Sequence, residues 1–131
     1  MSDVSSEKFQ AVVEEYLIRH KSILDVMTKL QESVARVNRA VVKSVTSCGC
    51  TEISAQRQKF PENVFFTDIK RYMDSHLCGS MCQDCKEALE SEIGRSIFYL
   101  TALCSTLDLD MEDIVSQENK RLRALGIFNL T

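Results

Sequence analysis

The sequence predicts an all-α fold: an antiparallel helical bundle of about four helices, with a loop region pinned by zinc. Three observations lead to this expectation. Apolar residues recur every three or four positions through most of the chain, no stretch shows the alternation of a strand, and cysteines form two short pairs beside a long polar segment. With 131 residues and 44% hydrophobic content, the chain is expected to be a single domain over residues 1–131.

The first 48 residues predict one long helix or two helices in line. They contain neither glycine nor proline, and Ser22, followed by Asp25, resembles a helix N-cap with its acidic partner. An unbroken helix of about 40 residues would be roughly 60 Å long, more than a small bundle needs. We therefore expect a break near Ser22 or packing of the excess length on a second subunit. The apolar positions are Phe9, Val13, Tyr16, Ile23, Met27, Leu30, Val34, Val37 and Val41.

A long loop is expected next, from residue 46 to residue 67, because this stretch contains Gly49 and Pro61 and shows no sustained period. A loop of about 20 residues in a compact domain usually needs a clamp or a function. A short helix should follow, N-capped by Thr67 and ending at Cys78-Gly79. Its buried side would be formed by Ile69, Tyr72 and Met73.

Two further helices complete the predicted bundle. One runs from Cys82 to Leu107, and the other is capped by Asp110 and ended by Gly126, before an apolar tail over 127–130. Each carries a single apolar stripe, and such stripes are buried against one another in an antiparallel bundle. The stripes are Leu89, Ile93, Ile97, Leu100, Cys104 and Leu107 in the first helix, and Met111, Ile114, Val115, Leu122 and Leu125 in the second.

The cysteine spacing predicts a tetracysteine metal site in the loop region of about 46–85. Cys48-Gly49-Cys50 and Cys82-Gln83-Asp84-Cys85 are two short chelating turns, and structural zinc takes four thiolates from two such turns. Cys82 and Cys85 would lie at the start of a helix, where free N–H groups favour thiolates. The expected ligands are therefore Cys48, Cys50, Cys82 and Cys85, which would tie the end of the first long helix to the start of the second.

Other uses of these cysteines stay open. A redox dithiol at Cys82 and Cys85, an iron–sulfur cluster and unmetallated thiols are the alternatives to zinc, and the first two lack a βαβ context or a ferredoxin-type cysteine run. Cys78 and His76 are close enough in sequence to replace a ligand. Cys104 falls on an apolar stripe and is expected in the core.

Composition and charge exclude several classes of function. The net charge of −3 gives no bias toward nucleic acid or anionic membranes, and no apolar run is long enough to cross a bilayer. The first eight residues are polar and lack the features of a secretory signal. We therefore expect a cytoplasmic protein, in which thiols are kept reduced and six cysteines suit metal binding or burial better than disulfides.

The stretch from Glu92 to Arg121 resembles the C-terminal half of the all-α nucleoside triphosphate pyrophosphohydrolases, the MazG-like superfamily. That family has a second carboxylate motif on an earlier helix, which would fall here on residues 31–35, Gln-Glu-Ser-Val-Ala. The resemblance implies an all-α dimer whose carboxylates hold Mg²⁺ and hydrolyse nucleotides. The two cysteine pairs are not part of the family's usual pattern, but they are similar to those of a group of small bacterial proteins.

The chain departs from this family at the metal ligands. Glu32 and Glu92 are kept, but Gln31 and Ala35 replace two acids, and Arg95 stands where an aspartate ligand belongs. A fixed cation beside a Mg²⁺ site repels the metal and pairs with the remaining acids. The sequence therefore does not favour magnesium.

Two interpretations of this region remain. Glu32, Glu92 and Arg95 form a structural ion-pair group, or they belong to an anion or nucleotide pocket in which Arg95, with Arg36 and Arg39, replaces the metal as the positive element. Arg36, Arg39 and Lys43 share one helix face, which is more often plain solvated surface.

The leading hypothesis is a non-catalytic, zinc-stabilised helical interaction or regulatory protein with a degenerate pyrophosphohydrolase-like site. It is expected to be a homodimer, from the apolar seam between Tyr16 and Val41 and from the family's habit, with a nucleotide or protein partner. The alternative is a Mg²⁺-dependent, house-cleaning nucleoside triphosphate pyrophosphohydrolase that uses Glu87, Glu90 and Asp108. Nucleic-acid binding through the basic helix face is a third, less favoured hypothesis.

Overall fold

The computed structural model describes residues 6–126, and the side chains of residues 8–126. The described part is mostly helical, which confirms the all-α fold class. The elements are α1 (Ser6–Tyr16), α2 (Ile23–Lys43), the π-helical turn η1 (Ser44–Cys48), β1 (Thr51–Ile53), the 3-10 helix η2 (Phe66–Arg71), β2 (Leu77–Gly79), α3 (Gln83–Thr106) and α4 (Met111–Leu125).

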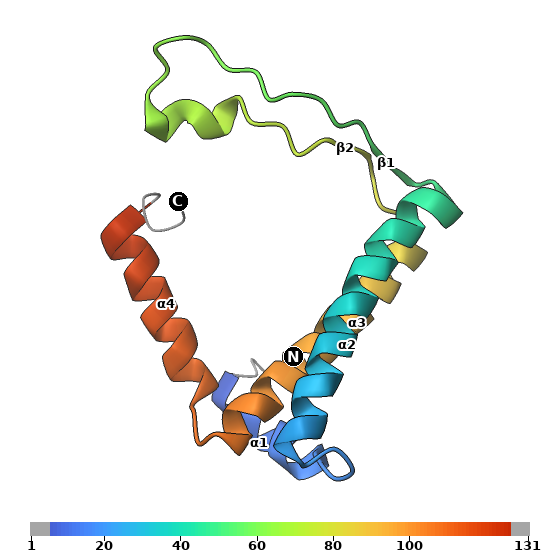
Figure 1. The fold of residues 1–131 in the computed structure, drawn as a ribbon, viewed down its shortest axis with the longest axis vertical. Helices are drawn as coiled ribbons and strands as arrows, with labels where there is room; N and C mark the ends of the chain where they lie inside the picture. Colours follow the sequence, from blue (N-terminus) through green and yellow to red (C-terminus); the bar gives the residue numbers. More distant parts are fainter. Residues whose placement is uncertain (1–5, 127–131) are drawn as a thin grey trace.

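The framework of the molecule is the α2–α3 hairpin, in which the two long helices run antiparallel side by side (Figure 1). α2 begins after Ser22, whose side chain accepts a hydrogen bond from the Leu24 amide at 3.3 Å. The break expected near Ser22 is therefore confirmed, and α1 and α2 are separate helices. The cap bond goes to the second residue of the helix, and Asp25 lies 3.8 Å from His20 instead.

Small polar residues let the two helices approach closely near their midpoint. Ser33 is buried on α2, and its hydroxyl donates to the Leu30 carbonyl at 2.6 Å. Ser96 on α3 donates in turn to the Ser33 hydroxyl at 3.0 Å. The hairpin is thus held by a short polar contact whose hydrogen-bonding groups are satisfied within the pair of helices.

The hydrophobic core lies where α1 packs across the lower end of the hairpin in Figure 1. Val13, Val26 and Ala102 are fully buried there, one from each of α1, α2 and α3. Cys104 is also buried, with 5% of its surface exposed, which confirms its expected place in the core. The partly buried residues around this core are Phe9, Leu17, Phe98 and Leu103.

The segment between the cysteine pairs forms a long arm that extends from the other end of the hairpin (Figure 1). β1 and β2 pair antiparallel at its base, with Thr51 opposite Gly79 and Ile53 opposite Leu77. Further out, the Gln58 side chain donates to the Asp74 carbonyl and accepts from the Asp74 amide, both at 2.8 Å. These bonds hold the two sides of the arm together.

The short helix expected from Thr67 to Cys78-Gly79 is wrong in its bounds. The structure has only the 3-10 helix Phe66–Arg71, and the last residues of the predicted helix form β2. Tyr72 and Met73, expected on a buried side, are 44% and 47% exposed. No helix or sheet layer packs beneath this part of the described chain, so the segment has no surface against which a longer amphipathic helix could be buried.

Asp110 is the N-cap of α4, as predicted, and its carboxylate accepts a hydrogen bond from the Asp113 amide at 3.0 Å. Gly126 ends the helix with a φ of +58°. α4 packs chiefly on α1 and then diverges from the hairpin (Figure 1), so its apolar stripe is not buried as expected. The predicted apolar tail over 127–130 lies outside the described residues.

None of the helices in the part of the chain that the structure describes combines the length and the apolar character that a bilayer span requires.

Candidate metal centre

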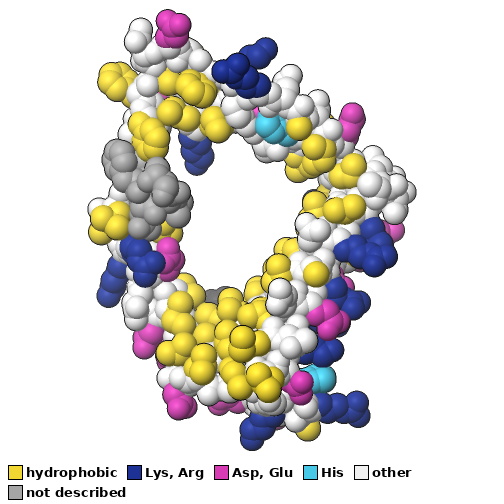
Figure 2. Space-filling view, in the orientation of Figure 1, with side chains coloured by type: hydrophobic (Ala, Val, Ile, Leu, Met, Phe, Trp, Pro, Cys, Tyr) yellow, Lys and Arg dark blue, Asp and Glu magenta, His cyan; other side chains and the backbone are white. Residues whose placement is uncertain are grey.

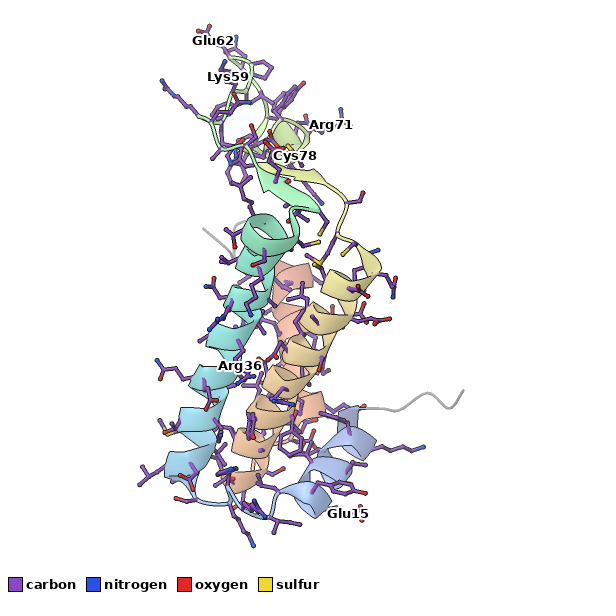
Figure 3. The ribbon with its side chains drawn as sticks, turned by 90° about the vertical axis from the view of Figure 1, so that its right-hand side faces the viewer. Glu15, Arg36, Lys59, Glu62, Arg71 and Cys78 are labelled. Atoms are coloured by element: carbon purple, nitrogen blue, oxygen red, sulfur yellow. The ribbon has the colours of Figure 1, made fainter. Side chains whose placement is uncertain are left out.

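The four cysteines singled out by their spacing lie together at the junction of the hairpin and the arm. The Sγ atoms of Cys48, Cys50, Cys82 and Cys85 all lie within 4.8 Å of one another, and those of Cys48 and Cys82 are 3.7 Å apart. Figure 3 shows the sulfur atoms gathered between the end of α2 and the start of α3. Thiols that are distant in the sequence thus form one cluster that could hold a metal ion.

The first cysteine pair follows α2, where the α-helix continues into a π-helical turn. The last turn of the α2 rod is the π-helical turn η1, and the Gly49 amide closes it with a hydrogen bond to the Ser44 carbonyl at 3.0 Å. Gly49 has a φ of +79°, a conformation that residues with a β-carbon adopt reluctantly. The chain therefore reverses between Cys48 and Cys50, which brings both thiols to the same side.

The start of α3 presents the second pair, as the sequence predicts. Cys82 is the N-cap residue, and its Sγ accepts a hydrogen bond from the Cys85 amide at 3.5 Å. Cys85 follows one helical turn later. Free amides at a helix N-terminus stabilise a thiolate, so this position suits a sulfur ligand that binds in its deprotonated form.

The pKa values within the cluster differ because the thiols hydrogen-bond to backbone amides and to one another. The backbone amide and the thiol of Cys85, followed by the Cys48 thiol, lower the pKa of Cys82 to about 7. The Cys82 and Cys50 thiols raise the pKa of Cys85 to about 12. For Cys48, a hydrogen bond with the Cys50 backbone lowers the pKa, but the Cys82 and Cys50 thiols outweigh it and the pKa is raised. Cys82 is thus the first of these three to ionise.

A buried hydroxyl pair that no sequence pattern predicted lies next to the first cysteine pair. Ser44 is fully buried, and its hydroxyl lies 2.7 Å from the Thr51 hydroxyl, which is also buried. Ser44 further donates to the Val41 carbonyl at 2.6 Å, and its own carbonyl accepts from the Cys50 thiol at 3.7 Å. Two polar residues near a chelating turn gave no periodic signal, so only their burial identifies them.

The remaining cysteines and His76 lie outside the cluster. Cys78 is exposed on β2, opposite Glu52, while Cys104 is buried in the hairpin. His76 has a φ of +61°, and its ring lies 3.4 Å from the Gln58 side chain in the arm. Within residues 8–126, the cluster of possible ligands comprises the two short cysteine pairs and no third partner.

A groove lies beside the cluster and is called the basic groove below. It has a volume of about 460 Å³ and is lined by Arg36, Arg39, Ala40, Lys43, Ser47, Cys48, Asp84, Cys85, Ala88 and Glu92. Its basic side chains come from α2, and its two acids come from α3. The groove is therefore of mixed charge.

The five residues predicted for an anion pocket do not share one cavity. Arg36, Arg39 and Glu92 line the basic groove, whereas Glu32, Arg36 and Arg95 line a separate hollow of about 50 Å³. Arg36 lies between them, on the face of α2 toward α3 (Figure 3). Its guanidinium is 3.3 Å from the Glu92 carboxylate and 3.7 Å from that of Glu32. Arg36 thus bridges Glu32 and Glu92.

The acids considered for a rebuilt magnesium site are dispersed. Glu87 accepts a hydrogen bond from Gln83 at 3.1 Å, and Asp108 lies in the turn after α3 with a φ of +56°. In the described chain, Glu32, Glu87, Glu90, Glu92 and Asp108 form no cluster of three or more possible ligands. These carboxylates therefore do not form the cluster of oxygen ligands that a hard divalent cation requires.

Comparison with known proteins adds no neighbour. No protein-family model, no curated protein and no solved structure matches the chain.

Proposed function

We propose that the chain is a non-catalytic helical interaction or regulatory protein whose arm and hairpin are joined by one structural zinc ion. The observation that carries the proposal is the meeting of Cys48, Cys50, Cys82 and Cys85, with every pair of Sγ atoms within 4.8 Å. Zinc would be held by these four thiolates, and its binding energy would stabilise the fold of the junction.

The spacing of the sulfurs supports zinc. A tetrahedral ion with Zn–S bonds of about 2.3 Å places its sulfurs about 3.8 Å apart. The Sγ atoms of Cys48 and Cys82 are 3.7 Å apart. Four thiolates complete the coordination of zinc, so such a site has no open position for a substrate or a reactive water.

The ion pairs of Arg36 support a non-catalytic role for the pyrophosphohydrolase-like region. A Mg²⁺ ion would need Glu32 and Glu92 as free anionic ligands. Arg36 pairs with both, and Lys29 lies 3.5 Å from Glu32. Binding a dication there would require these contacts to be broken, next to fixed positive charges. We propose that the region is degenerate and that any partner is a protein or a nucleotide held without magnesium.

Metal analysis of the purified full chain tests the zinc site. We expect one zinc per chain, lost in Cys85→Ser and retained in Cys78→Ser. The second variant is a matched control, because it also removes one thiol but from outside the cluster. Cobalt in place of zinc should give the visible absorption of a tetrahedral tetrathiolate. A chain purified without metal that also binds neither zinc nor cobalt would refute the proposal.

A nucleotide panel tests the non-catalytic assignment separately. The zinc-loaded chain is incubated with nucleoside triphosphates and Mg²⁺ or Mn²⁺, and we expect no release of pyrophosphate. Release that disappears in Glu92→Gln would instead support a pyrophosphohydrolase. Nucleotide binding without turnover, measured by thermal shift, would support a regulatory pocket and would leave the zinc result unaffected.

We propose a cytoplasmic setting, where the cluster thiols stay reduced and able to bind metal. Nucleic acid is a poor candidate partner, because the basic groove also contains Asp84 and Glu92 and Arg36 is paired. Retention on DNA or RNA at low salt would contradict this view.

A further inference from the structure

The folded chain exposes far more surface than its mass requires. A compact monomer of 14.9 kDa has an accessible surface of about 7,000 Å², whereas this chain exposes 10446 Å². Four hydrophobic residues of the described part are buried: Val13, Val26, Ala102 and Cys104. So small a core rarely stabilises a domain of this size. We therefore expect the exposed apolar surface to be buried against another molecule.

Part of that surface is a groove on the α2–α3 hairpin, called the hairpin groove below. It has a volume of about 430 Å³ and is lined by Leu30, Val34, Val37, Ile93, Ser96, Ile97 and Leu100. Val34 is 54% exposed and Ile97 46% exposed. The one polar side chain in it, Ser96, already donates to Ser33. Covering the groove therefore leaves no hydrogen-bonding side chain of the groove unsatisfied.

α4 carries an apolar stripe of the kind that fits such a groove. Ile114, Val115, Leu122 and Leu125 recur at helical spacing and are each at least 38% exposed. Glu118 falls on the same stripe but pairs with Arg121 at 2.8 Å, so it does not present an isolated charge. An amphipathic helix buries its stripe most effectively in the furrow between two packed helices.

The chain's own α4 is directed away from its own groove by a hydrogen-bonded elbow. Gln10 of α1 donates to the Leu109 carbonyl at 2.8 Å and to the Ser105 hydroxyl at 3.0 Å, and accepts from the Met111 amide at 2.9 Å. These three bonds fix the turn between α3 and α4. Figure 2 shows the resulting opening between α4 and the hairpin, with hydrophobic side chains along its lower and right-hand edges.

We infer that a second copy of this chain fills the opening, with the α4 of each copy lying in the hairpin groove of the other. The arrangement is a symmetric dimer. Each chain supplies one hairpin groove and one α4 helix, so the same contact between groove and helix is made twice. The surface in excess of a compact monomer is about 3,400 Å² per chain, including that of the extended arm, and obligate dimers bury about 1,000–2,500 Å² per chain. The inference does not depend on zinc.

Light scattering of the full chain at micromolar concentration tests the assembly. We expect twice the monomer mass for the natural chain and the monomer mass for Val34→Glu and for Leu122→Glu, because each variant would bury an unpaired carboxylate. Each should raise the dissociation constant about a hundredfold or more. Leu24→Glu is the matched control: Leu24 is also an aliphatic residue of α2, 72% exposed and outside the groove, and this variant should stay dimeric.

Photo-crosslinking tests the exchange of α4 without relying on a destabilising variant. A benzophenone-bearing phenylalanine replaces Leu122 in ¹⁴N-labelled chain, which is mixed with ¹⁵N-labelled natural chain and irradiated. We expect crosslinks that join the light α4 to heavy peptides containing Val34 or Ile97. The same probe at Lys120, on the opposite face of α4, should not reach them. A monomer, or crosslinks confined to the light chain or lying outside the groove, would overturn the inference.

Discussion

Gly79 on β2 lies directly against the backbone of Cys50. A β-carbon added at Gly79 would be 2.7 Å from the Cys50 carbonyl oxygen, closer than such atoms approach in real structures. Gly79 also has a φ of +81°, which disfavours any residue with a side chain. The absence of a side chain at Gly79 is therefore what allows the arm to close against the first cysteine pair.

Gly79→Ala is expected to weaken metal binding, because the backbone at Cys50 must shift and Cys50 is one of the four clustered thiols. Overpacking against backbone costs about 1–3 kcal/mol, enough to lower zinc affinity about tenfold or more. Competition with a chromophoric chelator measures the change. Gly49→Ala is the control: Gly49 has a φ of +79° but open space around it, so this variant isolates the backbone strain. Equal losses in the two variants would show that the close approach to Cys50 is unimportant.

Cys82 is expected to be alkylated before Cys85 in the metal-free protein. The thiolate is the reacting form, and the pKa of Cys82 is lowered to about 7 while that of Cys85 is raised to about 12. A short pulse of iodoacetamide at pH 7 should therefore modify Cys82 before Cys85. As the pH falls below 7, Cys82 becomes protonated and its labelling should slow.

Peptide mass spectrometry after the pulse resolves the two sites, since each position can be assigned by fragmentation. Prior loading with zinc should protect both, because a metal-bound thiolate is a poor nucleophile. Faster labelling of Cys85 than of Cys82 would contradict the assigned order of ionisation.

The sequence was most informative where a local pattern decides the structure. Ser22 and Asp110 cap helices as predicted, and the spacing within each cysteine pair singled out four residues that the structure brings together. Caps and short chelating turns involve residues that are near one another in the chain. Their geometry is therefore largely independent of the rest of the fold.

Tertiary contacts could not be predicted from the sequence, because they depend on how elements that are distant in the chain pack together. The periodicity of α4 shows that it has an apolar stripe, but not which surface covers it. The direction of α4 depends on the hydrogen bonds of Gln10 to the turn between α3 and α4, and these join residues about a hundred positions apart. The β1–β2 ladder was missed because Leu77 to Gly79 is too short to show alternation. The bridging role fell to Arg36 and not to Arg95, because side-chain reach across two helices depends on their packing.

Ser44→Ala is expected to destabilise the junction, because the buried Thr51 hydroxyl would lose its partner. An unsatisfied buried hydroxyl costs about 1–3 kcal/mol in the free energy of unfolding. Denaturant unfolding of the zinc-loaded chain measures this loss. The double variant Ser44→Ala/Thr51→Val removes both hydroxyls and keeps their shape, so it should recover most of the stability. A double variant less stable than the single one would argue against this hydrogen bond as the cause.

Val26→Ala is expected to lower the free energy of unfolding by about 2 kcal/mol, from the lost burial of two methyl groups and the cavity left behind. Val26 is fully buried against Val13 and Ala102. Val42→Ala on the same helix is the control, because Val42 is 47% exposed and its truncation should change stability little. Comparable losses for the two substitutions, measured by urea unfolding, would show that the core does not centre on Val26.

Removal of the metal is expected to loosen the arm and its junction while leaving the hairpin folded. The arm is joined to the helices through the cysteine cluster, the short β1–β2 ladder and the Ser44–Thr51 pair, whereas α2 and α3 pack along most of their length and share the core at Val26 and Ala102. Hydrogen exchange with and without a chelator, read by mass spectrometry, should therefore show faster exchange over residues 44–85 and little change over residues 90–104. Cys78→Ser should respond as the natural chain does, and Cys85→Ser should exchange rapidly in the arm even with zinc present. Uniform loss of protection over both helices would mean that the metal holds the whole fold, and unchanged protection of the arm would mean that the cysteine cluster does not hold it.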